Sequence, residues 1–548
     1  MKRKLSTTLA LILLLLTVMT AAGCNKKTDD TEKSAAPTEA AKVEDVTVNE
    51  KTLADYDKVN AFKYFNIATG VETNDLNNSA SANLVKEYTG YDVTYDQAPA
   101  DPSDAVTAIT NIFMLKSDYQ AVKVSKAQFY TLLQSGALKD ITEYVDASTN
   151  LKEQIDPFGW ETAKKDGKIY GIPQKSARKA ANTAIAFRLD WLNEYNEANP
   201  ETQIAVPSEE NNYSMTTSEF KTMLTFFATK VPKGGKAMAV DTNSVFIENI
   251  LPAFGVYQEW ADVSGELQYV INQPGFEDYM KYMEDLFDSD LIQYAATAND
   301  SGAVKSLQAK TSGAGRVAHW NAATIEATET QTTDPNISYI QALVPDSNKG
   351  DASAVRTFAG EGYSFYTVLP NYATDEQAAA VVDWVDKKLD QDFFLKLTIG
   401  TEGETFKMVG EDYYPILPAF DEQQSLADKF MDGSRESDYS KYWMCRTRKT
   451  EAQDKMFTIA NYNIDKTGVL NPISVMPPVI EYDTYYSGTS MSVIEAIVTG
   501  MYQKGVTKSL DELKAVFTSA NGQDITTGVN GWYSAWSAKD SFNAVKPR

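Results

Sequence analysis

The sequence predicts an α/β protein with more than one lobe, and two observations lead to this fold class. The chain has 548 residues, which is too long for one hydrophobic core, so two or more lobes are expected. In its first part, alternating segments typical of strands precede helical segments, at about 30 residues per strand–helix unit. This order predicts mainly parallel sheets flanked by helices.

The elements of the first part begin near Phe62. Residues 62–67 alternate apolar and polar side chains, which predicts a strand, and the helix expected at 80–88 stops at Gly90. The further elements expected up to residue 135 are strands at 91–95 and 121–124 and helices at 103–114 and 129–135.

Later in the chain, a strand at 183–188 leads directly into a helix at 189–196. Thr217, Ser218 and Glu219 form a capping pattern for a helix that ends near residue 230. The other expected elements are strands at 316–320, 337–343 and 363–368 and helices at 246–254, 276–288, 322–330, 375–389, 490–501 and 509–519.

The first 24 residues have the three parts of a secretory signal. A basic start at 2–4 precedes an apolar core at 5–19 and small residues at 21–23, as a signal peptide requires. The core is short for a membrane span, which needs about 20 apolar residues. We interpret 1–23 as a cleaved signal peptide; the alternative is a signal anchor that is never cut.

The segment Ala21-Ala22-Gly23-Cys24 resembles the bacterial lipobox, in which the cysteine is lipidated and becomes the first mature residue. Two acyl chains hold a protein stably at a membrane. The following residues, 24–60, contain few large apolar side chains and should form a flexible tether. These features predict a lipoprotein anchored on the outer face of the cytoplasmic membrane.

Charge and cysteine content exclude several classes of protein. The net charge is −24, and removal of the basic signal residues would change it to −27; such a field repels phosphate backbones, so we expect no nucleic-acid partner. The chain has two cysteines. If Cys24 is lipidated, Cys445 has no partner for a disulfide.

Residues for catalysis or metal binding are mostly missing from the sequence. His319 is the one histidine. A Ser-His-Asp site could use only this residue, and a zinc site would lack its usual second imidazole or thiolate. No nucleophile elbow, phosphate loop or EF-hand pattern occurs. We therefore predict no catalytic residue, metal or cofactor, and interpret His319 as structural or ligand-lining. A glycosidase that uses paired carboxylates would show no recognisable spacing in the sequence, so this class of enzyme is not excluded.

Aromatic residues make up 11% of the chain, including 8 Trp and 30 Tyr, and many lie in polar stretches. Flat aromatic faces can stack on the apolar faces of sugar rings, while nearby polar groups bind the hydroxyls. The alternative is that most of them fill cores. Trp384 lies in a regular helical pattern and is expected in the core.

Four segments resemble the extracellular solute-binding proteins of ABC importers, family 1, oligosaccharide type. They are GKIYGIP at 167–173, TAIAFRLDWL at 183–192, GRVAHW at 315–320 and IGTEGETF at 399–406. The resemblance implies a type 2 periplasmic-binding-protein-like fold, in which two lobes close on a ligand by hinge motion. It implies lobes at 61–175 plus 340–372 and at 176–339 plus 373–548.

The same resemblance implies that loops at strand ends line a cleft. The expected partners are a sugar or oligosaccharide, the transmembrane subunits of an ABC permease, and the membrane through the lipid anchor, with the protein itself a monomer. A secreted carboxylate-dependent enzyme that cleaves polysaccharides, and a binding protein for a peptide or other solute, are the alternatives. The candidate ligand-binding residues are Glu72, Asn74, Asp75, Ser125, Gln128, Arg178, Trp260, Trp320, Asn321 and Glu361.

The lipobox predicts a covalent lipid on Cys24. Mass spectrometry of the protein from the membrane fraction should find Cys24 as the first residue, carrying a diacylglyceryl group. An unmodified Cys24 in membrane-derived protein would contradict the anchor.

Overall fold

The computed structural model describes residues 51–67, 73–175, 181–240, 246–294, 302–326, 336–351, 355–359, 362–462, 464–472 and 506–545. The signal sequence, Cys24 and the tether up to residue 50 lie outside these ranges. Within them, no helix combines the length and apolar character that a membrane span requires.

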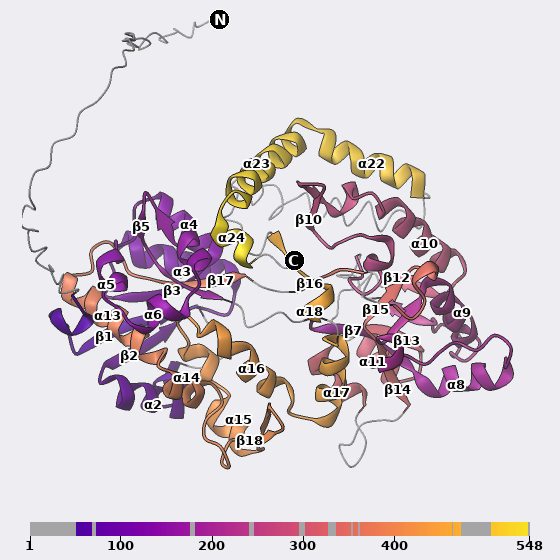
Figure 1. The fold of residues 1–548 in the computed structure, drawn as a ribbon, viewed down its shortest axis with the longest axis horizontal. Coiled ribbons are helices and arrows are strands. Elements are labelled where there is room, and N and C mark those ends of the chain that lie inside the picture. The colour runs from indigo at the N-terminus through magenta and orange to yellow at the C-terminus, as the bar shows by residue number, and fades with distance from the viewer. Residues whose placement is uncertain are drawn as a thin grey trace, which may run out of the picture. The chain divides into compact units, whose positions relative to one another are not determined.

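The first of two large sheets has five strands in the order β2-β1-β3-β17-β6 (Figure 1). β1 pairs in parallel with β2 and β3, whereas β17 is antiparallel to β3 and β6. The strands are β1 (Ala61–Asn66), β2 (Asp92–Gln97), β3 (Ala121–Ser125), β6 (Ile172–Lys175) and β17 (Tyr363–Val368).

Local sequence signals explain the helices of this part. Ser79 caps α2 by accepting a hydrogen bond from the Ala82 N–H at 3.1 Å, and Gly90 ends it at a φ of +80°, a conformation that glycine adopts without strain. The helices here are α1 (Thr73–Asn77), α2 (Ala80–Thr89), α3 (Pro102–Met114), α4 (Lys126–Gln134), α5 (Thr142–Asp146), α6 (Asn150–Gln154) and α7 (Pro157–Thr162).

The second large sheet has the order β12-β9-β13-β7-β14. β9 is parallel to β12 and β13, and β7 is antiparallel to β13 and β14. Its strands are β7 (Thr183–Arg188), β9 (Met238–Val240), β12 (Ile292–Tyr294), β13 (Ala314–Ala318) and β14 (Ile337–Ile340). The helices of this part are α8 (Leu189–Ala198), α9 (Thr217–Ala228), α10 (Phe276–Asp288), α11 (Gly302–Gln308), α12 (Ala322–Ile325) and α17 (Glu451–Ala460).

The α/β fold class is confirmed, but the sheets are mixed rather than mainly parallel. In each large sheet two of the four pairings are antiparallel. Strand–helix alternation predicts parallel neighbours only for strands that follow each other in the chain. β17 arrives from a distant segment, and its direction could not be read from local sequence.

Two other element predictions were wrong in part. The strand expected at 337–343 is β14 followed by β15 (Ala342–Val344), which pairs instead with β8 (Ser214–Thr216), and Gln341 lies at the break. The helix expected at 246–254 forms only a short 3-10 turn, Leu251–Phe254, because Pro252 lacks the N–H that a continuous helix would use. The helix expected at 490–501 lies outside the described residues.

The helix α13 (Asp375–Lys388) packs against α2, α5 and α6, beside the first sheet. The Trp384 ring centroid lies 5.5 Å from those of both Phe62 and Tyr64, which confirms Trp384 as a core residue. Residues 373–548, which include α13, were expected in the second lobe, but these contacts place α13 beside the first sheet. Helical sequence fixes the buried face of α13 but not the sheet on which it packs. The other expected boundaries stay a proposal.

The chain's last described helices contact parts of both large-sheet regions. α23 (Ala520–Ser537), which follows α22 (Val506–Thr518), contacts β11 (Glu266–Tyr269), and α24 (Asp540–Val545) contacts α7. The Tyr533 hydroxyl donates to Asp262 at 2.5 Å. Lys539 pairs with Glu161 at 3.1 Å. The remaining described elements include α14 (Gln391–Thr398), α15 (Ala419–Gln424), α16 (Glu436–Thr447), α18 (Ile464–Thr467), the hairpin β18 (Phe406–Val409) and β19 (Asp412–Pro415), and the two-residue strands β4 (Lys164–Lys165) and β5 (Lys168–Ile169).

A buried ion pair fastens α13 to the first sheet. Lys388 Nζ lies 2.5 Å from Asp432 Oδ2, and both side chains are buried. The Tyr64 and Thr367 hydroxyls donate to Asp432 Oδ1 at 2.6 and 2.5 Å. Burial lowers the pKa of Lys388 to about 8. Burial would raise the pKa of Asp432, but Lys388 and Lys123 outweigh it and hold that pKa below its usual value.

Asp432→Asn should destabilise this part of the protein by about 3–5 kcal/mol, because two buried ammonium groups lose their counter-charge. Urea unfolding at neutral pH measures the loss, with exposed Asp57→Asn as the matched control. The folded pKa of Asp432 is depressed, so its contribution is present at neutral pH and lost as the pH falls through that pKa. Equal stability of the two variants would contradict this role.

Candidate functional site

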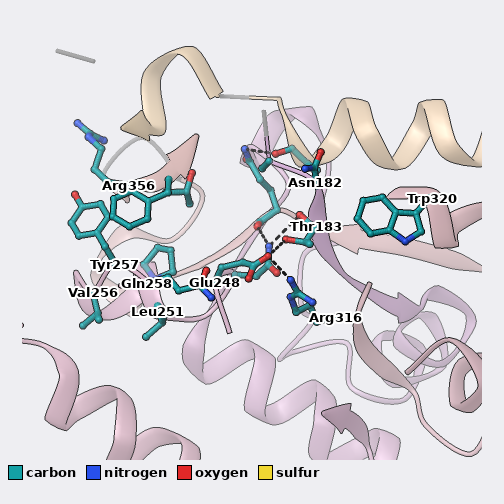
Figure 2. Close-up of a pocket in the computed structure, with 17 residues that line it drawn as sticks. Asn182, Thr183, Glu248, Leu251, Val256, Tyr257, Gln258, Arg316, Trp320 and Arg356 are labelled. Carbon is teal, nitrogen blue, oxygen red and sulfur yellow. Dashed lines mark hydrogen bonds and ion pairs between the residues drawn. The ribbon is translucent and has the colours of Figure 1, made fainter. Parts of the chain in front are cut away.

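A pocket of about 380 Å³ lies at the start of β7, within the size range of small-molecule sites, about 300–1,000 Å³. Figure 2 shows its polar centre at Glu248, Arg316 and Thr183, with Tyr257 on one side and Trp320 on the other. The lining residues are Ala181, Asn182, Thr183, Glu248, Asn249, Leu251, Pro252, Val256, Tyr257, Gln258, Arg316, Trp320, Gln341, Arg356, Thr357, Phe358 and Ala460.

Strand register places Thr183 and Arg316 on one face of the second sheet. Thr183 on β7 lies opposite Ala318, and Arg316 on β13 lies opposite Ile185. Because side chains alternate along a strand, Thr183 and Arg316 point to the same side. Both bind Glu248, whose Oε1 accepts from Thr183 Oγ1 at 2.5 Å and from Arg316 Nη2 at 2.7 Å.

Two buried amides extend this polar centre. Asn249 Nδ2 donates to the backbone carbonyls of Gln341 at 2.8 Å and Thr183 at 3.4 Å, and Gln341 Nε2 donates to the Ala460 carbonyl at 3.3 Å. The Asn249 Oδ1, Gln341 Oε1 and Arg316 Nε atoms are buried without a hydrogen-bond partner. Such atoms are costly unless a ligand or water satisfies them. We call Thr183, Glu248, Asn249, Arg316 and Gln341 the pocket floor.

Aromatic faces border the pocket floor. The rings of Tyr257 and Phe358 stack at 5.4 Å with an angle of 27° between their planes. Burial raises the pKa of the Tyr257 hydroxyl, although nearby Arg356 opposes the rise, so the hydroxyl stays protonated at neutral pH. Trp320 is 57% exposed, which leaves an aromatic face open to a ligand.

The backbone entering β7 is held by Asn461. Its Oδ1 accepts from the Ala181 N–H at 2.7 Å, and its Nδ2 donates to the Ala181 carbonyl at 2.8 Å. The amide therefore pairs with Ala181 as a neighbouring strand would. This contact positions the two pocket residues that follow, Asn182 and Thr183.

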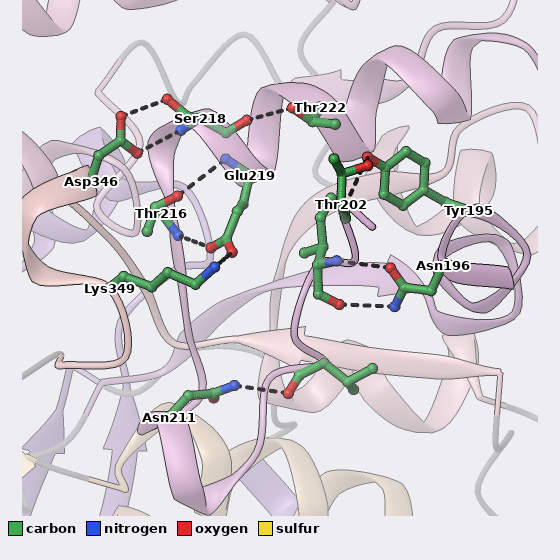
Figure 3. A network of polar contacts seen from close by, with 12 residues as sticks. Tyr195, Asn196, Thr202, Asn211, Thr216, Ser218, Glu219, Thr222, Asp346 and Lys349 are labelled. Atoms are coloured by element: carbon green, nitrogen blue, oxygen red, sulfur yellow. Dashed lines mark hydrogen bonds and ion pairs between the residues drawn. The ribbon is translucent and has the colours of Figure 1, made fainter. Parts of the chain in front are cut away.

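β15, the strand that follows Gln341, is held in place by β8, which leads directly into α9. β15 pairs with β8, and Thr216 at the end of β8 caps α9 by accepting from the Glu219 N–H at 3.1 Å (Figure 3). Ser218 donates to Asp346, its hydroxyl lying 2.5 Å from Oδ2, and lowers the pKa of that carboxyl. The capping residue is Thr216, one position before the pattern expected from the sequence.

One of the sequence-predicted site residues, Trp320, lines this pocket, and its neighbour Asn321 does not. Asn321 turns its side chain back onto the chain, where Oδ1 accepts from the Ala318 N–H at 3.2 Å.

Four other predicted residues lie elsewhere. Ser125 and Gln128 form the capping box of α4, with the Ser125 N–H donating to Gln128 Oε1 at 2.9 Å; they border a separate hollow between α3 and α4. Asn74 and Asp75 lie on the short helix α1, and Asp75 is exposed. These positions follow strands of the first sheet, and the pocket described here is built on the second.

Trp260 does not line this pocket. It is fully buried in β10 (Trp260–Val263), with its ring 5.6 Å from that of Tyr269. The surrounding polar sequence reflects the exposed turn of the β10–β11 hairpin and not the environment of the Trp side chain. Glu72, Arg178, Glu361 and the lipidation candidate Cys24 lie outside the described residues.

None of the five pocket-floor residues was predicted from the sequence as a site residue. Glu248 and Asn249 fell in a segment expected to be helical, where polar residues are usually solvated. Gln341 carried a usable signal, because it is a polar residue inside the apolar run at 337–344, and a buried amide needs a partner. Thr183 and Arg316 could not be paired with Glu248 without the strand register.

His319 and Cys445 are both buried, which suits a structural role. His319 is buried against the rings of Trp320, Trp443 and Phe457, and its backbone N–H donates to the Asn182 carbonyl at 2.9 Å. Cys445 is buried, and burial raises the pKa of its thiol to about 12. The described part of the chain contains no cluster of three His, Cys, Asp or Glu residues suited to a metal.

Comparison by sequence gives limited information. No protein-family model matches the chain. An uncharacterized protein in the butB 5′ region of Niallia circulans is 25% identical over 261 residues, which is 47% of this chain and 98% of that protein.

Comparison by structure is more informative. An HMO binding, ABC-transporter associated solute binding protein from Bifidobacterium longum infantis has 13% identity and a TM-score of 0.60, covering 88% of this chain and 100% of its own. The chain has the fold of ABC-transporter solute-binding proteins. The S. pneumoniae substrate binding protein FusA, in complex with kestose, shares this solute-binding-protein fold with 14% identity and a TM-score of 0.61, over 87% of this chain and 99% of its own.

A third structure, the alginate-binding protein AlgQ2, has 14% identity and a TM-score of 0.57, over 88% of this chain and 99% of its own. All three neighbours are described as binding proteins and not as enzymes. The solute-binding-protein fold expected from the four sequence segments is therefore confirmed.

The contrast between two tryptophans can be measured. Trp260→Ala should destabilise the protein by about 3–5 kcal/mol, because it empties a large core site. Trp320→Ala should change the unfolding free energy by only about 0.5 kcal/mol, because the side chain is largely exposed. Urea unfolding of the two variants checks this. A loss for Trp320→Ala as large as that for Trp260→Ala would mean that Trp320 serves the core.

Proposed function

We propose that this chain is the substrate-binding lipoprotein of an ABC importer, which captures an oligosaccharide outside the cell and delivers it to a membrane permease. The observation that carries the proposal is the match of most of this chain to solute-binding proteins, with at least 87% of it covered in each case. The pocket on the second sheet supplies the proposed ligand contacts.

The chemistry of the pocket favours a sugar. A sugar ring offers apolar C–H faces and a rim of hydroxyl groups, and it needs flat apolar surfaces together with planar polar groups. The stacked Tyr257 and Phe358 rings and the exposed Trp320 supply the first. The carboxylate, guanidinium and amides of the pocket floor supply the second. Hydrogen bonds that orient a ligand between aromatic faces are typical of specific small-molecule sites.

The ligands of the structural neighbours support the same class. One is described as binding HMO, another is in complex with kestose, and a third is an alginate-binding protein. An N-glycan transport solute binding protein from Streptococcus pneumoniae has the same fold, with 14% identity and a TM-score of 0.53, over 87% of this chain and 98% of its own.

In the proposed cycle, Cys24 carries the lipid that keeps the protein at the outer face of the cytoplasmic membrane. Residues 24–60 form a flexible tether between this anchor and the binding lobes. Two lobes close on the sugar by hinge motion. The permease recognises the closed form and receives the ligand. The protein acts as a monomer and has no nucleic-acid partner.

The test is a thermal-unfolding screen of the purified full chain against monosaccharides, oligosaccharides and peptides. A ligand at 100 times its Kd should add about 2.7 kcal/mol, which is a rise of several degrees in Tm. We expect a rise with one class of oligosaccharide and no cleavage of that sugar by mass spectrometry. A rise with peptides alone would overturn the substrate, and sugar cleavage would make the protein an enzyme.

A further inference from the structure

A buried glutamine behind the pocket wall holds one of its aromatic residues. We propose that Gln273 is a positioning residue of the ligand site, which fixes Tyr257 in the pocket wall before a solute binds. The inference rests on the proposed function in one respect, namely that the pocket on the second sheet is where the solute binds. Gln273 does not line the pocket, so it would act on the solute through Tyr257.

The loop before β10 forms the wall at this point. Residues 256–258 all line the pocket. The Tyr257 ring stacks on Phe358 at 5.4 Å, and Figure 2 shows it on the opposite side of the polar centre from Trp320. The loop belongs to no helix or strand, so its backbone groups need hydrogen-bond partners from elsewhere.

Gln273 supplies those partners. Its Oε1 accepts from the Tyr257 N–H at 2.7 Å, and its Nε2 donates to the Tyr257 carbonyl at 3.1 Å. Nε2 also donates to the carbonyls of Glu259 at 3.1 Å and Gln268 at 3.2 Å. A flipped amide would set its oxygen against three carbonyl oxygens, so the orientation is fixed. One side chain therefore binds both backbone groups of Tyr257 and joins the loop to β11.

The position of Gln273 in the fold favours a firm hold. The residue is 3% exposed and lies between the 3-10 turn Val270–Asn272 and α10. Its own carbonyl accepts from the Phe276 N–H at 3.0 Å. Because regular elements flank it on both sides, its amide is placed more precisely than a group inside a long loop.

A strained turn follows Tyr257 and is supported by the same amide. Glu259 has a φ of +64°, a left-handed conformation that residues other than glycine seldom adopt without support. Gln273 donates to its carbonyl, and Asn471 Nδ2 donates to its carboxylate Oε2 at 3.1 Å. Such strain persists where the surroundings over-determine the backbone, and it is concentrated at functional sites.

An aromatic face that is already in place favours binding. A solute that stacks on a mobile ring must first order it, at a cost in conformational entropy. The alternative is that Gln273 only satisfies backbone groups, as Asn196 does when it binds the N–H and the carbonyl of Ile204 (Figure 3). The two roles differ in one respect: a positioning residue affects binding only while the Tyr257 ring is present.

The experiment is a double-mutant cycle on the purified full chain. Native mass spectrometry against hydrolysates of starch, cellulose, xylan, fructan, pectin and alginate, and against a tryptic digest of casein, identifies the solute bound best. Titration calorimetry then measures its Kd. Gln273→Met keeps the size of the side chain and removes its hydrogen bonds. We expect a Kd about 10-fold weaker for Gln273→Met, and no further weakening when it is added to Tyr257→Ala.

Gln120→Met is the matched control. Gln120 is also a buried glutamine, 8% exposed, and its Oε1 accepts from the Lys63 N–H at 2.8 Å in the first sheet. This variant should lose stability and leave Kd unchanged, which separates positioning from general destabilisation. Circular dichroism confirms that each variant is folded.

A second measurement needs no variant. In hydrogen–deuterium exchange of the wild-type chain, the Tyr257 amide should exchange slowly already without a solute, because Gln273 binds it in the free protein. Fast exchange that becomes slow only with the bound solute would overturn the positioning role.

The outcomes separate this inference from the proposed function. An unchanged Kd in Gln273→Met, or the same loss with and without the Tyr257 ring, would overturn the positioning role and leave an oligosaccharide-binding protein. Binding of a peptide and no sugar would overturn the proposed substrate, and the same cycle with that peptide would then decide the positioning role.

Discussion

The antiparallel register between β7 and β13 is the constraint on which the pocket depends. It puts Thr183 and Arg316 on the same face of the second sheet, where both meet Glu248 from a separate loop. A shift of one residue would turn either side chain to the other face and leave the carboxylate without its two donors. The sheet therefore positions two of three polar groups that are far apart in the sequence, and the loop that carries Glu248 supplies the third.

The pocket also contains buried polar atoms without hydrogen-bond partners, which lowers the stability of the fold. Most buried polar atoms in proteins are hydrogen-bonded, yet Asn249, Gln341 and Arg316 each keep a buried polar atom without a partner. By contrast, Asp432 in the first sheet region is satisfied by Lys388, Tyr64 and Thr367. Sites where local rules of stability are broken are expected at functional positions, and in the pocket floor three such atoms lie close together.

Element types could be predicted well from local patterns. The strand at 183–188 and the helix at 276–288 have the predicted bounds, because side-chain alternation and helical periodicity are local properties. The candidate site was predicted poorly. Trp260 and Trp320 both occur in polar surroundings, yet one is fully buried and the other is 57% exposed. Burial depends on which distant segments pack over a side chain, and composition does not carry that information.

The sequence by itself determined the α/β class, the export and lipidation signals that predict its location, and the segments typical of solute-binding proteins. These follow from periodicity, composition and short motifs. Only the tertiary structure decided the direction of β17, the packing of α13 beside the first sheet, and the convergence of Thr183, Glu248, Asn249 and Gln341. The reason is physical: pairing and burial between distant segments are set by the whole fold, and a local pattern is compatible with many such arrangements.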